Sequence, residues 1–345
     1  MTRFKTIAFA AISSVALAAC GGGSSGASRD AAWAVGSSTL YPFAAAVAEE
    51  VAKGGVKAPK VEQNGSGAGI KLFCAGVGAA HPDIANASRR MKKSEFEDCQ
   101  KNGVKDIAEI QVGLDGIAFA EGKTGPGMAL TPTDIYKALA AKPFGKPNTA
   151  KTWKDVNPAL PALPILVYGP PTTSGTRDAL AELILTKGCD SDPAMKALKE
   201  KDKDAHKKVC TEVREDGAYV DSGEEDNLIV QKLAENANAI GIFGYSFLEE
   251  NMDKLKGITI DGIQPTYASI SDFSYPGARP LYIYIKMAHL NAVPGLKEFI
   301  ATWPKVWGPD GLLKKKGMVI SPEDVRNKNA PLAANPVAMD ASTLK

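Results

Sequence analysis

A strand, a turn rich in glycine and hydroxyl side chains, and a helix follow one another four times in this chain. The apolar runs that precede the turns are Ala31–Val35, Lys60–Gln63, a segment near Ile84, and Ile165–Tyr168; the turns contain GSST (36–39), GSGAG (65–69), SR (88–89) and TTSGTR (172–177). This alternation predicts an α/β fold with parallel strands and helices on both faces of the sheet. In such sheets ligands bind at the carboxyl ends of the strands.

The turn chemistry predicts an anion at these strand ends. A helix start presents unsatisfied backbone N–H groups and about half a unit of positive charge. Glycine lets an oxyanion approach the backbone, and Ser and Thr add hydroxyl donors. Helix capping alone explains any single turn. Four such turns, two of them with an adjacent Arg89 or Arg177, favour a small tetrahedral oxyanion.

The amino terminus is typical of an export signal. Arg3 and Lys5 precede the short apolar run 7–17, which is too short to span a bilayer, and Cys20 is followed by a Gly/Ser tether. This resembles a bacterial lipoprotein signal, in which the cysteine is lipidated after removal of residues 1–19. An ordinary cleaved signal with a chance cysteine is the alternative. We expect an exported, periplasmic protein, held on a membrane by lipid.

Size and charge limit the function. The chain has 345 residues, 44% of them apolar, which suffices for one large domain or two lobes. The formal net charge is +2 and falls to 0 without Arg3 and Lys5. A nearly neutral protein is not built to bind nucleic acid in bulk, so any anion must be held by local geometry.

Export makes the cysteines informative. Four remain besides Cys20, and an even number in an exported chain indicates disulfides. Three pairings are possible, and the two local loops favour Cys74–Cys99 with Cys189–Cys210. No CxxC occurs and the three histidines are scattered, so we expect no metal and no cofactor.

Six segments occur in an order that resembles a known family. They are GSSTLYPFAAAVAE, NGSGAGIKLFCAG, DIANASRRMK, SGTRDAL, DNLIVQKLAENANAIGIFGYSFL and YPGARPLYIYIK, between about Trp33 and Trp307. Together they resemble the phosphate-binding protein of the bacterial Pst ABC transporter. The resemblance implies a two-lobe type II periplasmic binding fold that closes on phosphate like a clamshell and delivers it to a membrane permease.

With this resemblance the chain is expected to cross between lobes twice, through a hinge. Lobe 1 would contain residues 30–117 plus 265–345, lobe 2 residues 118–264, and residues 20–29 would form the tether. The ligand residues that the resemblance implies are Ser38, Thr39, Leu40, Ser66, Ser88, Arg89, Ser174, Gly175, Thr176 and Arg177. Arg177 would be the main counter-charge, because a guanidinium can make two parallel bonds to phosphate.

Two departures from the family pattern concern selectivity. Relatives carry an aspartate, which accepts the proton of hydrogen phosphate and so rejects sulfate, where this chain has Arg89. They also carry an arginine where this chain has Pro170 and Pro171. A site without an acceptor cannot use the proton for discrimination. Three carboxylates remain open as acceptors: Asp178, Asp226 and Asp83.

Competing functions stay open at this stage. The alternatives are a binder of another oxyanion, a non-transport surface scaffold, and a phosphatase on the same fold. No histidine stands near a candidate nucleophile and no GxSxG occurs, so we expect a binding protein rather than an enzyme. Phe243, Tyr245 and Phe247 alternate as in a strand and are expected in the core.

Overall fold

The computed structural model describes residues 29–223 and 226–344. The predicted signal 1–19, the lipidation site Cys20 and all but the last residue of the tether lie outside the described residues. Within the described part of the chain, no helix is both long and apolar enough to cross a membrane.

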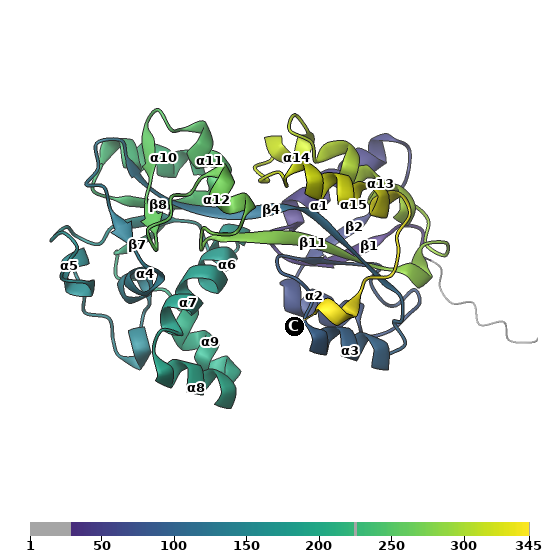
Figure 1. Cartoon of the computed structure of the whole chain (residues 1–345), viewed down its shortest axis with the longest axis horizontal. Coiled ribbons are helices and arrows are strands. Elements are labelled where there is room, and N and C mark those ends of the chain that lie inside the picture. The colour runs from purple at the N-terminus through teal and green to yellow at the C-terminus, as the bar shows by residue number, and fades with distance from the viewer. Residues whose placement is uncertain (1–28, 224–225, 345) are drawn as a thin grey trace, which may run out of the picture.

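A mixed sheet runs through the whole molecule in the order β2-β1-β3-β11-β4-β8-β6-β7, with β9 also paired to β4 (Figure 1). Its strands are β1 (Trp33–Gly36), β2 (Lys60–Gln63), β3 (Ile84–Ala87), β4 (Ile107–Gly122), β6 (Val167–Gly169), β7 (Tyr219–Asp221), β8 (Ile240–Gly244), β9 (Leu255–Gly257) and β11 (Ala278–Lys286). A small second sheet joins β5 (Ala129–Leu130) to β10 (Thr259–Ile260).

The long strand β4 connects the two halves of the sheet. Its residues 107–116 pair with β11, and its residues 117–120 pair with β8. We call the half around β1, β2, β3 and β11 lobe 1, and the half around β6, β7 and β8 lobe 2. Figure 1 shows β4 and β11 crossing the middle of the molecule.

Strand direction differs from the sequence-based expectation in the middle of the sheet. The strands β1, β2 and β3 are parallel to one another, and so are β6, β7 and β8. However, β11 is antiparallel to both β3 and β4, and β4 is antiparallel to β8. The turn pattern could not reveal this, because the two hinge strands carry no strand–turn–helix unit of their own.

Helices cover both faces of each half of the sheet. Those of lobe 1 are α1 (Tyr41–Lys53), α2 (Ser66–Phe73), α3 (Lys93–Lys101), α13 (Leu296–Val306), α14 (Leu312–Lys315) and α15 (Glu323–Ala334). Those of lobe 2 are α4 (Pro132–Leu139), α5 (Trp153–Val156), α6 (Gly175–Ala179), α7 (Thr186–Cys189), α8 (Pro193–Lys201), α9 (Lys203–Thr211), α10 (Asp226–Glu235), α11 (Tyr245–Glu250) and α12 (Tyr267–Ser271). A π-helical stretch, Leu180–Leu185, joins α6 to α7.

The hydrophobic cores follow the two lobes. In lobe 1, Val47, Phe299 and Trp303 belong to one cluster and Phe73 to another. Lobe 2 has one large core, which also contains Ile270 and Tyr275. The predicted boundary between residues 264 and 265 would assign these two residues to lobe 1. The same cluster also contains Leu114 and Val319, and α12 contacts the hinge strands β4 and β11, so the boundary near residue 264 stays a prediction.

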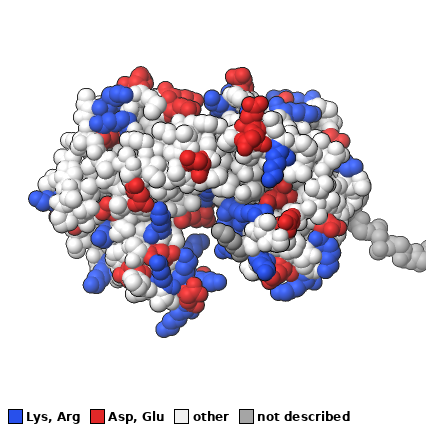
Figure 2. All heavy atoms as spheres, viewed as in Figure 1, with Lys and Arg blue, Asp and Glu red and all other residues white. Residues whose placement is uncertain are grey.

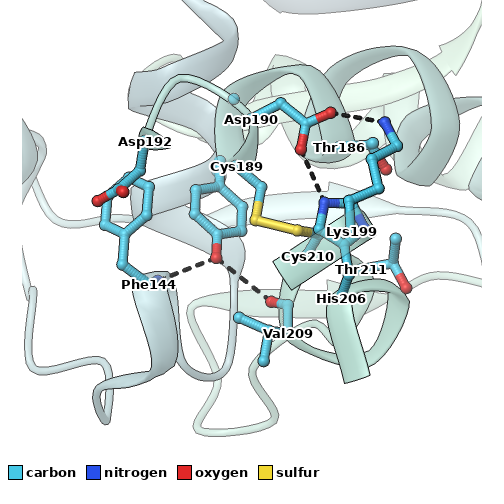
Figure 3. The surroundings of a disulfide bond; sticks show 12 residues. Phe144, Thr186, Cys189, Asp190, Asp192, Lys199, His206, Val209, Cys210 and Thr211 are labelled. Atoms are coloured by element: carbon cyan, nitrogen blue, oxygen red, sulfur yellow. Dashed lines mark hydrogen bonds and ion pairs between the residues drawn. A yellow bond between two sulfur atoms is a disulfide. The ribbon is translucent and has the colours of Figure 1, made fainter. Parts of the chain in front are cut away.

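Two disulfides are present, one in each lobe. Cys74 at the end of α2 is joined to Cys99 of α3. Cys189 of α7 is joined to Cys210 of α9, and both sulfur atoms are buried (Figure 3). These are the two pairs that close the shortest loops. Beside the second bridge, Asp190 lies between His206 and Lys199, at 2.7 and 2.8 Å.

Charges of both signs are interspersed on the face shown in Figure 2, where no large area carries one sign alone. This face therefore has no extended basic stripe along which a nucleic-acid backbone could lie.

Candidate anion site between the lobes

A cavity of about 450 Å³ lies between the lobes, at the hinge. Ser38 and Thr39 follow β1 of lobe 1, Gln63 is the last residue of β2, and Gly244 is the last residue of β8 in lobe 2. Asp115 and Gly116 come from β4 itself. The remaining lining residues are Tyr41, Pro42, Phe43, Thr173, Ser174, Gly175, Thr176, Asp226, Phe247, Lys316 and Gly317. The cavity is thus at the strand ends where the α/β pattern predicts a ligand.

The first turn brings two hydroxyls to the lobe interface. The Ser38 hydroxyl donates to an Asp178 carboxylate oxygen of lobe 2, and Thr39 Oγ1 donates to the Gly175 carbonyl at 3.2 Å. The turn is tightly held, since the Ser37 N–H donates to the Asn86 carbonyl at 2.9 Å. Both hydroxyls therefore lie where an anion entering the cavity would meet them.

Lobe 2 contributes the start of a long helix. Ser174 is the N-cap of α6, and its side chain accepts from the Thr176 N–H at 3.2 Å. Helical structure then continues without a break from Gly175 through Cys189. The positive end of this helix faces the cavity, which makes it favourable for an anion.

Glycine is required at position 175. A Cβ placed on Gly175 would lie 2.5 Å from Thr39 Cα and 2.8 Å from Thr39 N. Those are backbone atoms of the other lobe, so no side chain can move aside to make room. The two lobes are therefore in contact at the point where the predicted ligand segments meet.

Leu40, Ser66 and Ser88 do not line the cavity. The Leu40 side chain is fully buried in the lobe 1 core. Ser66 and Ser88 are also buried, and their hydroxyl oxygens lie 3.0 Å apart, with the Ser88 N–H donating to Ser66 Oγ. This pair fixes the second and third predicted segments against each other beside the first turn.

The two arginines of the predicted ligand set have protein partners. Arg89 donates to both carboxylate oxygens of Glu95, at 3.0 and 2.7 Å. Burial is the largest influence and would raise the pKa of Glu95, but the hydrogen bonds and charges of Arg89 and Lys92 together hold that pKa below its usual value. Arg177 lies over the Tyr219 ring, 4.5 Å from its centroid, and donates to the Pro170 carbonyl. Neither arginine lines the cavity.

Arg279 contacts two residues of the cavity wall and is absent from the predicted ligand set. It is 4% exposed, and its Nη2 donates to Thr39 Oγ1 at 2.8 Å. Its Nε donates to Asp115, which lines the cavity, at 2.9 Å. Burial raises the pKa of Asp115, and the charge of Arg279 opposes that shift. The only sequence signal was its place in the segment YPGARPLYIYIK.

The three candidate proton acceptors lie at different distances from the cavity. Asp178 contacts Ser38, and Asp226 lines the cavity. Asp83 lies instead just before the amino end of β3, buried against Arg29 and His289. That is the opposite end of the strand from the ligand turn, which removes Asp83 from the candidates.

The possible metal ligands that lie together are at the second disulfide. Among the described residues, Cys189, His206 and Cys210 have ligand atoms within 4.8 Å of one another. Two of these atoms are the sulfurs that are bonded to each other. None of these three residues lines the cavity.

Comparison with known proteins agrees with this architecture. Residues 23–302 match the model of the PBP superfamily domain. The chain is 34% identical to SphX of Synechococcus elongatus over 75% of this chain and 69% of that protein. It is 32% identical to the phosphate-binding protein PstS of Staphylococcus saprophyticus over 86% and 83% of the two chains.

A solved structure is also similar. The crystal structure of a possible phosphate-binding protein from Planctomyces limnophilus matches with a TM-score of 0.70 and 27% identity, over 88% of this chain and 98% of that one. With the two lobes, the hinge and the sequence matches, the chain belongs to the PBP superfamily and, within it, to the PstS-like family.

Proposed function

We propose that the protein captures inorganic phosphate between its lobes and presents it to the permease of an ABC transporter. The observation that carries the proposal is the meeting of Ser38 and Thr39 with the Ser174–Thr176 helix start across one cavity. Hydroxyls, backbone N–H groups and a helix amino end are the donors that bind phosphate in proteins. The names of the PstS relatives support phosphate as the anion.

The predicted ligand residues divide into those that line the cavity and those that support it. Five predicted residues line the cavity and would donate to the anion directly: Ser38, Thr39, Ser174, Gly175 and Thr176. Leu40 would contribute its backbone at the start of α1. Ser66, Ser88 and Arg89 would support the first turn from behind, and Arg177 would fix β6 to β7 through Tyr219.

We also propose that the protein binds phosphate without catalysing a reaction. None of the three histidines lines the cavity, so no imidazole is placed to activate a hydroxyl or a water molecule there. The proposal also includes export and lipidation at Cys20, with residues 20–29 as the tether and the lobe limits near residues 117 and 264. The hinge would be the two crossings through β4 and β11.

Equilibrium dialysis tests the proposal. The mature chain, residues 20–345 with Cys20→Ser, is equilibrated with labelled phosphate, and a generic phosphomonoester is assayed in parallel. We expect one phosphate per chain and no release of phosphate from the ester. A folded chain that retains no phosphate would refute capture, and steady hydrolysis would assign an enzyme instead.

A further inference from the structure

Arg279 lies on the hinge and is fixed there by a permanent partner. It stands directly opposite Asp115 in the β11–β4 ladder. Its Nε donates to Asp115 Oδ2 at 2.9 Å, and its side chain is 5% exposed. A guanidinium buried in this way needs a paired carboxylate, and the neighbouring hinge strand supplies it. This contact does not depend on the position of either lobe.

The other two nitrogens of Arg279 point to different lobes. Nη2 donates to Thr39 Oγ1 of lobe 1 at 2.8 Å. Nη1 donates to Glu182 of lobe 2 at 2.5 Å. Glu182 belongs to the π-helical stretch that continues α6, seven residues after Gly175. The rigid fork of the guanidinium thus links the two sides of the cavity.

We propose that Arg279 is a positioning residue that couples the orientation of the Thr39 hydroxyl to closure of the lobes, with Glu182 as its closing partner. The inference rests on the proposed function. When lobe 2 meets lobe 1, Glu182 reaches Nη1, while Nη2 holds Thr39 Oγ1 at the cavity. When the lobes separate, Glu182 moves away with its helix and Arg279 keeps Asp115.

The exposure of the partners fits these different roles. The Asp115 side chain is 14% exposed, whereas that of Glu182 is 53% exposed. A half-exposed carboxylate can return to water at little cost when the lobes open. Glu182 therefore adds stability to the closed state without trapping the protein in it. Such a contact lengthens the bound lifetime rather than creating the anion site.

Stopped-flow kinetics with inorganic phosphate tests the role of Glu182. Glu182→Gln removes the charge of an exposed side chain, so the variant is expected to fold. The dissociation rate should rise about two- to fivefold, as for an ion pair of this exposure, with little change in the association rate. The matched control is Glu235→Gln on α10, an exposed acid of lobe 2 paired only within its own helix.

A double-mutant cycle assigns the effect to Arg279. Arg279→Gln should raise the dissociation rate about tenfold or more, because Thr39 also loses its partner. Adding Glu182→Gln to that variant should then change nothing further. If Arg279→Gln fails to fold, Arg279→Lys takes its place in the cycle, and an intermediate dissociation rate is expected.

The outcomes separate this inference from the proposed function. If the parent binds phosphate and Glu182→Gln dissociates at the parent rate or more slowly, the closing contact is refuted. Equal effects of Glu182→Gln in the presence and absence of Arg279 would refute the coupling. A parent that binds no phosphate would overturn the proposed function itself, before any variant is compared.

Discussion

At the scale of single residues, we expect selectivity to depend on a carboxylate beside the bound anion. Near neutral pH phosphate keeps at least one proton and sulfate has none, so an acceptor in the site favours phosphate. Asp178 already accepts a hydrogen bond from Ser38 across the lobes. The O–H of a bound hydrogen phosphate would replace that donor. We therefore propose Asp178 as the acceptor of the phosphate proton, in place of the aspartate that the family resemblance would put at Arg89.

Replacing Asp178 by Asn should lower the affinity for phosphate and reduce the preference for phosphate over sulfate. A hydrogen bond to a charged acceptor contributes about 1.5–3 kcal/mol, so phosphate affinity should fall by about tenfold or more. Calorimetric titration with both anions measures the ratio. Asp226→Asn is the matched comparison, because Asp226 is the other remaining candidate acceptor and lines the cavity. If that variant alone changes the ratio, Asp226 is the acceptor and the assignment to Asp178 fails.

Replacing Arg177 by Ala should change the pKa of Tyr219 and the stability of the protein more than its affinity for phosphate. Burial raises the pKa of Tyr219 to about 12, and the charge of Arg177 opposes that shift. Removal of Arg177 should therefore raise this pKa further and cost about 0.5–2 kcal/mol from the lost cation–π contact. Phosphate affinity should change less than about threefold. A loss of thirtyfold or more in dialysis would restore Arg177 as the direct counter-charge expected from the sequence.

At the scale of elements, the start of α6 must come very close to the turn before α1. Gly244 offers a comparison, because it also lines the cavity but a Cβ on it would meet nothing within 4 Å. Position 175 is different, since the added atom would overlap the backbone of Thr39. We therefore expect full closure of the lobes to require a residue without a side chain at position 175.

Gly175→Ala should keep the protein folded and prevent full closure. The overlap costs about 1–3 kcal/mol in the closed state, which corresponds to a loss of about five- to 150-fold in phosphate affinity. Calorimetry gives the affinity, and thermal unfolding without ligand should be nearly unchanged. Gly244→Ala should bind like the parent. Equal affinities for all three proteins would show that the lobes need not approach this closely.

The Cys189–Cys210 disulfide joins α7 to α9 in lobe 2, and we expect it to stabilise the folded lobe. The double replacement Cys189→Ala/Cys210→Ala removes a crosslink of sequence separation 21. The free energy of unfolding of lobe 2 should fall by about 3 kcal/mol in the chain-entropy model, with phosphate affinity nearly unchanged. Urea titration followed by circular dichroism measures it. Unchanged stability would mean that the packing of α7 on α9 suffices.

Sequence pattern predicts the turns and helix starts of this chain, whereas contacts between distant segments depend on the tertiary structure. The turns at Ser38 and Ser174 could be predicted because glycine and hydroxyl residues specify turns and caps from sequence alone. Phe243 lies in β8 as expected, but Tyr245 and Phe247 lie in α11, because the strand ends at Gly244. Arg279 could not be recognised, since its partners Asp115 and Glu182 are brought to it only by the hinge ladder and by lobe contact.

At the scale of the whole molecule, β4 and β11 hold two separately packed lobes around one cavity. The resemblance predicts two lobes and two crossings, and the structure has both. The predicted counter-charges Arg89 and Arg177 contact Glu95 and Tyr219, while the hinge residue Arg279 contacts Thr39 of the cavity wall. We therefore expect anion capture to depend on contact between the lobes more than on one charged side chain.

Calorimetric titration of the mature chain, residues 20–345 with Cys20→Ser, with phosphate and then with sulfate measures anion capture and selectivity together. We expect one phosphate bound per chain, and sulfate at least about tenfold weaker, because sulfate meets a carboxylate without a proton to share. A folded chain that gives no heat with phosphate, or that binds sulfate as tightly as phosphate, would contradict this expectation.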